Sequence, residues 1–312
     1  MVIQTIMCVP LCGFGNRLKF MASVKGIAKK LKIQSIKVVW RQTMDCNVSW
    51  SETFKNVPDF ELIDEEEIYR NKEDVLYFGY IHMNQILENL REYRKPKESI
   101  LVVEGGHECK SSEVPLFDYL KQKSAFYQSI EWADEIEDRI KKLGNIPKIA
   151  IHYRHVNEDT DQADVKSNPF CNFSQNSPFN EFEAIFKKIK QKAFFISNSA
   201  YHKNYIKENL NAKKVVVLHQ DDSNDRSSTE SMMTSIVEFL LMSRCDLIIG
   251  SYYSSYSDEA TYFNFVPKYM PMRDSLKNLE PFTRNYHTVL KPSEIDRALV
   301  LNADMKTLTK FL

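Results

Sequence analysis

The chain has 312 residues, 43% of them hydrophobic, and its 19 Phe and 15 Tyr can fill the core of one large domain or of two ordinary ones. Lys and Arg together number 42, and so do Asp and Glu, which gives a formal net charge of zero. A neutral chain has no global field that would hold nucleic acid or an anionic membrane surface. Any recognition of an anion must therefore be local.

Cysteine usage and the first residues indicate the compartment. The six cysteines are scattered, without a Cys-x-x-Cys pair or a His/Cys group at metal-ligand spacing, so we expect buried thiols in a reducing environment. Residues 1–11 are apolar, but they lack a basic leader, are too short to cross a bilayer and lead directly into a Gly-x-Gly turn. These features predict a cytoplasmic protein with no transmembrane segment.

In the first half of the chain, residues 2–9 are predicted to form a strand. Residues 16–31 are predicted to form a helix, because Leu18, Met21 and Val24 begin an apolar repeat of three to four positions. The next expected elements are strands at residues 36–40, 75–78 and 100–104 and helices at residues 83–93 and 117–143. The Gly-Asn-Ile-Pro segment at residues 144–147 ends this series, so we place a domain boundary after residue 145.

The second half of the chain repeats the alternation. We expect strands at residues 149–154, 194–197, 215–218 and 247–250, and helices at residues 181–192, 201–210, 232–245 and 293–311. Two alternating halves favour an α/β fold with parallel sheets. We predict two Rossmann-like domains, residues 1–145 and 146–312, that face a cleft.

Arg154 stands at the end of the predicted strand at residues 149–154, after a strongly apolar run. Open α/β sheets bind ligands at the carboxyl ends of their strands, and a guanidinium there can hold a phosphate or carboxylate with two hydrogen bonds. We interpret Arg154 as an anion clamp. The alternative is a salt bridge to a neighbouring helix.

Three strand-to-helix junctions in the second half are polar. If the strands are parallel neighbours, all three loops emerge along one edge of the sheet. Hydroxyls and amides at a helix start can satisfy phosphate oxygens, although each cluster by itself is also an ordinary helix cap. Together with Arg154 they outline a diphosphate pocket. The junction residues are His152 and Arg154 with the acids after them, Ser197, Asn198 and Ser199, and the segment from Ser251 to Ser257 that contains Ser254, Ser255 and Tyr256.

Glu238 is the only charged residue among residues 231–243, a predicted helix that is apolar on most of its faces. A buried carboxylate needs partners. Guanine presents two adjacent N–H donors, at N1 and N2, and one carboxylate can accept a hydrogen bond from each of them. The alternatives are a narrow solvent-exposed face of the helix or a pairing with a lysine.

The turn at Gly13, Phe14, Gly15, Asn16 and Arg17 joins the first strand to the first helix. Its glycines permit a close approach of the backbone to a ligand, and its amides point toward the expected cleft. No acidic residue ends the second strand, so the turn is not the fingerprint of an NAD site.

Four motifs in this order resemble those of GDP-fucose-dependent fucosyltransferases, most closely the α1,6 and nodulation-type branch, which adopts the two-Rossmann GT-B fold. The likeness spans about residues 8–260. The motifs are Gly-Phe-Gly-Asn-Arg-Leu at residues 13–18, His-Tyr-Arg-His at 152–155, Phe-Phe-Ile-Ser-Asn-Ser at 194–199, and the segment 236–251 with its trailing Ser-Ser-Tyr.

The resemblance implies a glycosyltransferase that moves L-fucose from GDP-fucose to a glycan hydroxyl with inversion and without a metal or other cofactor. It assigns Arg154 to the donor diphosphate and His152 to the nucleotide. Glu238 falls on an Asp that recognises guanine, and Ser254 or Ser255 falls on a donor-contacting serine. Ser197, Asn198 and Ser199 fall on the family's Thr-Asp-Asp. The N-terminal domain would then serve the acceptor and the C-terminal domain the nucleotide sugar.

The chain departs from the family at several of these positions. His155 stands where many members have a second arginine, and Asn198 and Ser199 replace two acids, which weakens the case for fucose more than the case for GDP. Glu238 keeps the carboxylate of the usual Asp but lengthens its reach. The alternatives are the same fold with a xylosyl or rhamnosyl donor, and a non-catalytic GT-B-like protein that binds carbohydrate.

In the expected mechanism, Arg154, amides near Ser254 and Ser255, and Arg17 neutralise the charge that builds on the departing GDP. A general base would activate the acceptor hydroxyl. Glu158 and Asp159 are the nearest acids in sequence, followed by His152 and His155. The Asp-rich segment 221–225 is expected to be a solvated loop rather than a metal site, and Trp40, Trp50 and Phe54 form either an acceptor platform or part of the core.

Overall fold

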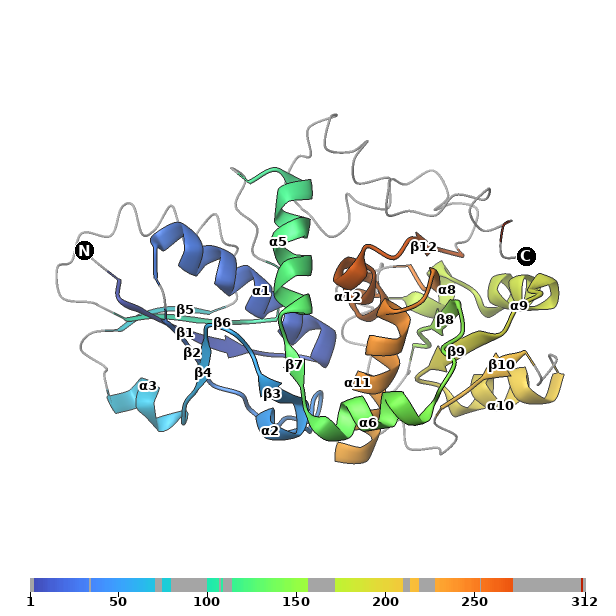
Figure 1. Cartoon of the computed structure of the whole chain (residues 1–312), viewed down its shortest axis with the longest axis horizontal. Coiled ribbons are helices and arrows are strands. Elements are labelled where there is room, and N and C mark those ends of the chain that lie inside the picture. Colours follow the sequence, from blue (N-terminus) through green and yellow to red (C-terminus); the bar gives the residue numbers. More distant parts are fainter. Residues whose placement is uncertain are drawn as a thin grey trace. The chain divides into compact units, whose positions relative to one another are not determined.

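The computed structural model describes residues 3–33, 35–70, 75–79, 100–106, 108, 114–156, 172–209, 214–218, 228–252, 254–271 and 310. The chain divides into two compact units, and each is described by itself below. Unit 1 comprises Met1–Asp138 and Arg226–Met233, and unit 2 comprises Arg139–Asp225 and Thr234–Leu312. Figure 1 draws the elements of both units.

Unit 1 is built on a parallel five-stranded sheet in the order β4-β2-β1-β6-β5. Residues 6–10 of its central strand β1 are all buried. A small antiparallel pair, β3 and β7, lies outside this sheet. The elements are β1 (Thr5–Pro10), α1 (Phe14–Leu31), β2 (Ser35–Val38), α2 (Trp50–Thr53), β3 (Phe54–Asn56), β4 (Phe60–Leu62), α3 (Glu66–Arg70), β5 (Val75–Gly79), β6 (Ile100–Gly105), α5 (Leu116–Gln128), β7 (Glu131–Trp132) and α6 (Asp134–Lys142), which continues into unit 2.

Helix α1 confirms the apolar repeat found in the sequence. Leu18, Met21 and Val24 are fully buried on one face, and the helix begins at Phe14, two residues before the predicted start. Lys32 ends it in the left-handed conformation, with its N–H bonded to the carbonyls of the preceding turn. Lysines in the last turn complement the negative end of the helix dipole.

The predicted long helix at residues 117–143 is wrong, because α5 and α6 are separate helices. Strand β7 lies between them and pairs with β3 through Phe54 and Trp132. The Ser129 hydroxyl donates to the carbonyl of Phe126 and helps to end α5. Neither Gly nor Pro interrupts residues 117–143, so the local pattern carried no signal for a break that the burial of Trp132 imposes.

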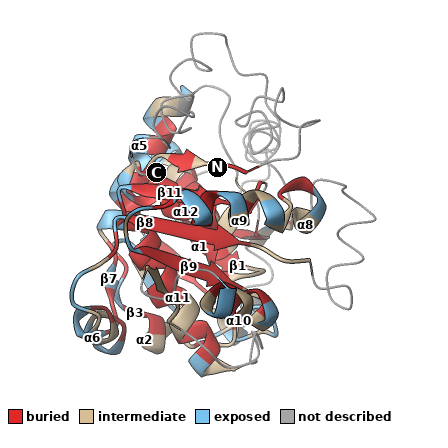
Figure 2. Ribbon diagram, turned by 90° about the vertical axis from the view of Figure 1, so that its right-hand side faces the viewer, coloured by how far each residue is buried: buried red, intermediate tan, exposed pale blue. Residues whose placement is uncertain are grey.

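Unit 2 contains a second parallel five-stranded sheet, in the order β10-β9-β8-β11-β12. Strands β8 and β9 are buried along their whole length (Figure 2). The elements are β8 (Ile149–Tyr153), α8 (Phe173–Asn176), α9 (Phe179–Lys188), β9 (Ala193–Ser197), α10 (Ala200–Asn209), β10 (Val215–Val216), α11 (Thr229–Ser243, whose first turn belongs to unit 1), β11 (Leu247–Gly250), α12 (Ser255–Asn264) and β12 (Lys268–Tyr269).

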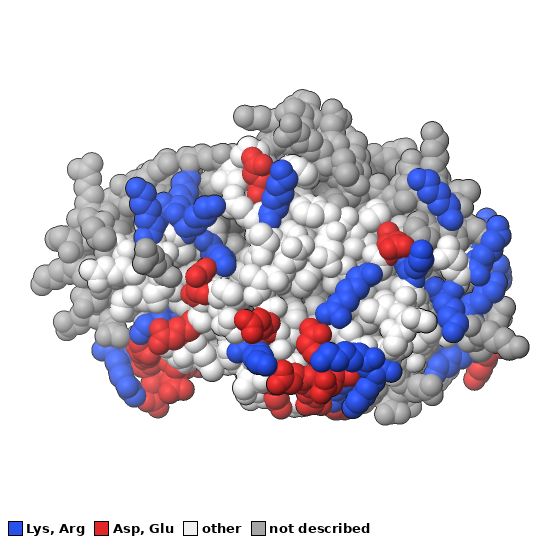
Figure 3. Space-filling model, in the orientation of Figure 1, with Lys and Arg blue, Asp and Glu red and all other residues white. Residues whose placement is uncertain are grey.

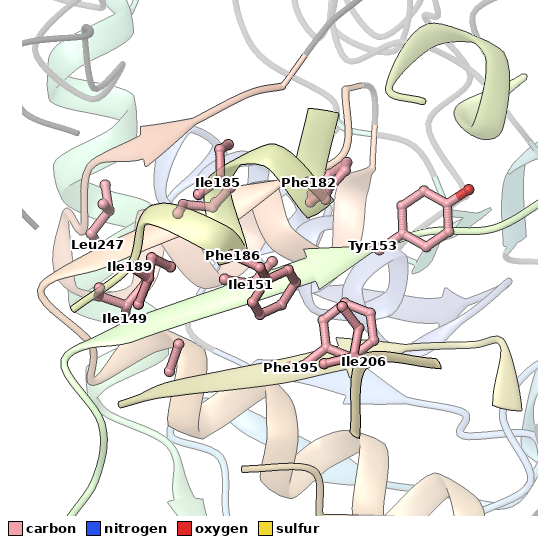
Figure 4. Packing of buried hydrophobic residues seen from close by; sticks show 12 residues of the cluster. Ile149, Ile151, Tyr153, Phe182, Ile185, Phe186, Ile189, Phe195, Ile206 and Leu247 are labelled. Carbon is pink, nitrogen blue, oxygen red and sulfur yellow. The ribbon is translucent and has the colours of Figure 1, made fainter. Parts of the chain in front are cut away.

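The core of unit 2 forms where α9 and α10 pack on β8 and β9. Figure 4 shows Ile151 and Tyr153 of β8 among Phe182 and Phe186 of α9 and Phe195 of β9. Burial of these large side chains is the main stabilising term for the unit, because each removes apolar surface from water. This packing fixes the strands whose carboxyl ends carry the polar junctions.

The two sheets confirm the predicted α/β class with parallel strands. The helices predicted at residues 83–93 and 293–311 lie outside the described residues. The boundary after residue 145 and the cleft remain predictions. Acidic and basic side chains are interspersed on the face drawn in Figure 3, as a formal net charge of zero leads one to expect.

Candidate functional site

The three polar junctions of unit 2 do lie along one edge of its sheet. Strands β9, β8 and β11 are parallel neighbours, with Tyr153 paired to Ser197 and His152 paired to Gly250 in register. Because the strands run in the same direction and end level with one another, the loops after them emerge side by side. This arrangement confirms the expectation that depended on strand order.

Arg154 directly follows β8 and is held at this edge through its backbone. Its N–H donates to the Ser251 hydroxyl at 2.9 Å, which ties the end of β8 to the end of β11. Its guanidinium carbon lies 5.5 Å from the ring centroid of Phe173 in α8, within range of a cation–π contact. Arg154 is half-buried, so its cation is positioned at the edge of the sheet that binds ligands in open α/β folds.

The loops after β8 and β9 are joined by His155 and Asn198. The Asn198 Oδ1 accepts from the His155 N–H at 2.7 Å, and the Asn198 Nδ2 donates to the His155 carbonyl at 2.9 Å. Ser174 contributes on the other side, where its hydroxyl accepts from the Val156 N–H. Asn198 therefore orders the segment that follows Arg154.

Ser197 and Ser199 also bond within unit 2. The Ser197 hydroxyl accepts from the Ser199 N–H at 3.1 Å, and the Ser199 hydroxyl lies 2.7 Å from Nδ1 of His202. Burial, followed by the charge of the nearby His155, lowers the pKa of His202 to about 4. The second junction is thus a network of neutral groups.

The third junction is held by a lysine for which the local sequence pattern carried no signal. Lys268 of β12 is buried and its Nζ donates to the Ser251 carbonyl at 3.1 Å, the Ser257 hydroxyl at 2.9 Å and the Asp258 Oδ1 at 2.6 Å. A Cβ on Gly250 would lie 2.7 Å from the Lys268 Cε, so the glycine is required for the lysine to cross the loop. This clamp sets the start of α12.

Ser254, Ser255 and Tyr256 form that start. Ser254 is the buried N-cap residue of α12, and its side chain makes no capping hydrogen bond to the helix. Ser255 begins the helix and is half-buried. The amides of the first turn of a helix carry a partial positive charge, which favours an anion at this position.

His152 is a buried side chain with an unused polar atom. It is 4% exposed, and its Nδ1 has no hydrogen-bond partner among the residues that the structure describes. Burial, together with the charges of Lys268 and Arg154, lowers the pKa of His152 to about 3, while the charge of Asp258 acts in the opposite direction. The imidazole is therefore neutral at pH 7 and is available for a hydrogen bond.

Glu238 of α11 is 5% exposed, which excludes the alternative of a solvent-facing position. In the described part of the chain, its Oε1 has no hydrogen-bond partner. Burial raises the pKa of Glu238 to about 7, while the charge of Lys203 acts in the opposite direction. Since an unpaired buried carboxyl is costly, this position is suited to a hydrogen-bond donor that the described residues do not supply.

Tyr256 connects the two unsatisfied groups. Its ring centroid lies 5.2 Å from that of His152 and 5.6 Å from that of Phe239, the residue after Glu238. Its hydroxyl donates to the carbonyl of Ser235. Burial, followed by the charge of Glu238, raises the pKa of Tyr256 well above its usual value. Tyr256 thus packs between the end of β8 and helix α11.

In unit 1, Arg17 is fully buried rather than directed at a ligand. Its Nε donates to the Cys12 carbonyl at 2.8 Å, Nη1 to the Arg41 carbonyl at 2.6 Å and Nη2 to the Thr43 hydroxyl at 2.9 Å. These bonds join the loops after β1 and β2. The predicted contact of Arg17 with a departing diphosphate is therefore replaced by a positioning role for its guanidinium.

Gly13 precedes α1 with a φ of −69°, which any residue can adopt. A Cβ there would make only an ordinary contact, 3.8 Å from the Asp45 carbonyl oxygen, so the fold of unit 1 does not require glycine. Close approach of a ligand to the backbone remains a reason for it. Gly15 and Asn16 lie in the first turn of α1, buried and half-buried respectively.

The aromatic residues proposed as a platform pack against one another. Trp40 and Phe54 have centroids 5.4 Å apart, Trp50 and Phe54 4.6 Å, and Phe54 contacts Trp132 at 5.5 Å. The Arg17 guanidinium covers one face of Trp40 at 4.7 Å. These contacts favour the core interpretation.

Several predicted residues cannot be placed. Glu158, Asp159 and the Asp-rich segment 221–225 lie outside the described residues. Within the described ranges, no group of three or more His, Cys, Asp or Glu side chains is arranged to hold a metal ion. None of the helices in those ranges is long and apolar enough to cross a membrane.

Comparison with known proteins gives structural relatives only. No protein-family profile matches the chain, and no curated protein sequence matches it. NodZ alpha-1,6-fucosyltransferase soaked with GDP-fucose matches with a TM-score of 0.53 and 16% identity over 83% of this chain and 92% of that chain. POFUT1 in complex with GDP matches with a TM-score of 0.55 and 12% identity over 86% and 99%. A mutant of Arabidopsis thaliana FUT1 in complex with GDP matches with a TM-score of 0.55 and 13% identity over 86% and 70%.

These likenesses confirm the predicted fold class. The chain has a GT-B-like α/β fold with two Rossmann-like parallel sheets, similar to that of fucosyltransferases. At 12–16% identity the likeness carries the fold and no more. The activity has to be argued from the site itself.

Proposed function

We propose that the protein is a glycosyltransferase that transfers L-fucose from GDP-fucose to a glycan hydroxyl, with inversion and without a metal. One observation carries the proposal. At the carboxyl edge of the unit 2 sheet, Arg154 follows His152, whose Nδ1 is buried, and Tyr256 packs between His152 and the helix that carries the buried Oε1 of Glu238. Neither Nδ1 nor Oε1 has a hydrogen-bond partner among the described residues. The structural relatives that contain GDP or GDP-fucose support this assignment.

Glu238 is the proposed guanine-binding residue. The N1 and N2 donors of guanine match the two oxygens of one carboxylate, whereas the same edge of adenine presents an acceptor at N1 that would repel it. Hydrogen bonds from guanine would offset the free-energy cost of burying the carboxylate oxygens of Glu238. His152, neutral because its pKa is about 3, would add a hydrogen bond to the nucleoside.

The diphosphate is proposed to lie between Arg154 and the first turn of α12. Arg154 can hold two phosphate oxygens, and the amides at Ser254 and Ser255 add the positive end of the helix dipole. The donors at Arg154 and at the start of α12 would stabilise the negative charge that develops on GDP as the bond to the sugar breaks. In unit 1, the backbone at Gly13, Gly15 and Asn16 is proposed by itself as a ligand-binding turn.

The sugar is the less constrained part of the proposal. Asn198 and Ser199 occupy the positions of two acids in the resembled family, and both bond to neighbouring protein groups. A xylosyl or rhamnosyl donor would need the same nucleotide site with different sugar contacts, and it stays the alternative. Glu158 and Asp159 are the proposed candidates for the general base that deprotonates the acceptor.

Calorimetric titration of GDP, UDP and ADP tests the proposal. We expect GDP to bind best, Arg154→Ala to weaken GDP by about 100-fold or more, and Glu238→Gln to reduce the preference for GDP over ADP. Arg70→Ala is the control for loss of an arginine, since Arg70 is exposed and pairs with Glu66 on the surface of α3. Preference for UDP would exclude guanine and with it fucose.

Turnover separates an enzyme from a binding protein. If the preferred nucleotide is GDP, the donor sugar is identified by comparing the rates of GDP release from GDP-fucose, GDP-mannose and GDP-rhamnose. Nucleotide binding without release from any donor, even when glycan acceptors are added, would support the non-catalytic alternative.

A further inference from the structure

A second polar group lies at the carboxyl edge of the unit 1 sheet, where strand β6 ends. Glu104 is paired with Val9 of β1, and Gly105 and Gly106 follow it. From β1 the chain runs through α1 to β2 on one side of the sheet, whereas β6 lies on the other side of β1. In open α/β sheets this change of direction marks the crevice in which ligands bind.

The loops that border this crevice are closely packed. The Leu11 N–H donates to the Gly105 carbonyl at 2.8 Å. A Cβ on Gly106 would lie 2.8 Å from the Cys12 Sγ and 2.9 Å from the Leu11 carbonyl oxygen, so only glycine permits this approach. Glu104 is therefore fixed close to the turn at Gly13.

One oxygen of Glu104 is held and the other is not. Its Oε1 accepts from Nη1 of Arg41 at 2.7 Å. Arg41 is itself gripped by both oxygens of Glu65, through Nε at 3.0 Å and Nη2 at 2.6 Å. Among the residues that the structure describes, Oε2 of Glu104 has no hydrogen-bond partner, and the side chain keeps 16% of its surface exposed. The carboxylate is thus oriented at the edge of the sheet with one acceptor unused.

The chemistry of the carboxylate limits its ligand. Glu65 and Glu104 both accept hydrogen bonds from the Arg41 guanidinium. An ionised carboxylate is an acceptor only, so Oε2 of Glu104 accepts a hydrogen bond from a donor such as a neutral hydroxyl and repels a phosphate that approaches it. A sugar hydroxyl is the neutral donor that a glycosyltransferase must bind besides its anionic nucleotide.

We propose that Glu104, oriented by Arg41, binds the acceptor glycan by accepting a hydrogen bond from one of its hydroxyls at Oε2. This inference rests on the proposed function, and it adds an acceptor-binding residue in unit 1. Glu104 positions the acceptor and makes no contact with the nucleotide. Arg41 and Glu65 act through Glu104 and touch no substrate.

The test compares two variants of the whole protein. Glu104→Gln keeps the shape of the side chain and an oxygen for Arg41, but it replaces the unused acceptor with an NH₂ group. Glu61→Gln is the matched control, because Glu61 is an exposed carboxylate on β4 of the same sheet and lies outside the Arg41 network. Both variants are first checked for thermal stability and for GDP affinity by calorimetry.

The readout is transfer from GDP-fucose to fluorescently labelled neutral tetrasaccharides of glucose, galactose, mannose and N-acetylglucosamine. We expect Glu104→Gln to raise the acceptor KM by about tenfold or more, as the loss of a hydrogen bond to a charged group predicts, while GDP affinity stays unchanged. Glu61→Gln should alter the acceptor KM by less than about threefold, as expected for an exposed surface position. An unchanged KM in Glu104→Gln, or equal increases in both variants, would overturn the inference.

Direct binding separates this inference from the proposed function. Saturation-transfer NMR of the same tetrasaccharides, without nucleotide, should give signals with the wild-type protein that Glu104→Gln weakens. If the wild type binds a tetrasaccharide through Glu104 but binds no GDP, the donor assignment fails and the glycan subsite stands. If GDP binds and tetrasaccharide binding is the same in both proteins, the subsite fails and the donor assignment stands.

Discussion

Asn198 and His155 exchange two hydrogen bonds, at 2.7 Å and 2.9 Å, between the loops that follow neighbouring strands β9 and β8. The side-chain amide of Asn198 thereby makes a pair of hydrogen bonds like those between neighbouring strands, beyond the point where β8 and β9 end. Arg154 lies immediately before the paired segment. Its position is consequently set on one side by Ser251 and on the other by Asn198.

Asn198→Ala should destabilise the fold and loosen the anion site. It leaves the N–H and carbonyl of His155 without partners, at a cost of about 1–3 kcal/mol. Chemical denaturation measures the stability, and calorimetry measures GDP affinity, which we expect to fall. Asn198→Asp can still accept from the N–H but cannot donate to the carbonyl, so its loss of stability should be smaller. Asn204→Ala, on the exposed face of α10, is the control and should change neither quantity.

GDP affinity should rise with pH between 6 and 8. Guanine donates to an ionised carboxylate, and burial raises the pKa of the empty Glu238 to about 7. Below that value, binding must also remove a proton, so affinity falls by up to about tenfold for each pH unit. Ionisation of the GDP phosphates affects binding to both proteins equally. Glu238→Gln should therefore lack the part of the pH dependence that comes from the carboxyl group. Parallel pH profiles for the two proteins would contradict the assignment.

The same carboxyl should make the nucleotide-free protein less stable as pH rises. Its pKa is about 7 in the folded state and 4.5 as a usual value, so the folded state binds the proton more tightly. The resulting stabilisation is complete below pH 4.5 and is lost as pH rises through 7, on the order of 3 kcal/mol in total. Urea denaturation at pH 5 and pH 8 should show this loss in the wild type, and Glu238→Gln should largely abolish it.

His152 should act in the opposite direction. Burial lowers its folded-state pKa to about 3 from a usual value of 6.5, so the unfolded chain binds the proton first. Stability from this group is present above pH 6.5 and is lost as pH falls toward 3, by on the order of 3 kcal/mol between pH 7 and pH 4. His152→Gln should reduce the acid sensitivity measured by urea denaturation. Identical acid profiles would mean that other groups control it.

Gly250→Ala should destabilise unit 2 through Lys268. The new Cβ would lie 2.7 Å from the Lys268 Cε and 2.8 Å from the Ser257 hydroxyl, and overpacking of this kind costs about 1–3 kcal/mol. Lys268→Ala removes the clash but leaves Asp258 without its buried cation, which also destabilises. The double variant should therefore lose less stability than the sum of the two single changes. If the losses of stability from the two single changes add up in the double variant, the clash with Lys268 is not what destabilises Gly250→Ala.

The tertiary structure decided which polar residues have partners. Arg17, Arg154 and Glu238 all appeared in the sequence as charges next to apolar segments. Arg17 donates to two carbonyl oxygens and one hydroxyl oxygen, whereas the buried Oε1 of Glu238 has no hydrogen-bond partner in the part of the chain that the structure describes. Lys268 stands in a short apolar segment and had no local signal, yet it clamps the third junction. These outcomes depend on segments that are distant in the chain.

The sequence by itself determined the alternation of strands and helices, the apolar face of α1 and the polar ends of β8, β9 and β11, because these follow from periodicity over a few residues. Only the tertiary structure decided the order of strands that brings the three junctions to one edge, and the separation of α5 from α6 by β7. It also decided that Arg41 binds one carboxylate oxygen of Glu104. The reason is physical: local spacing sets which face of an element is apolar, while burial and hydrogen-bond partners are set by contacts between elements that local spacing does not specify.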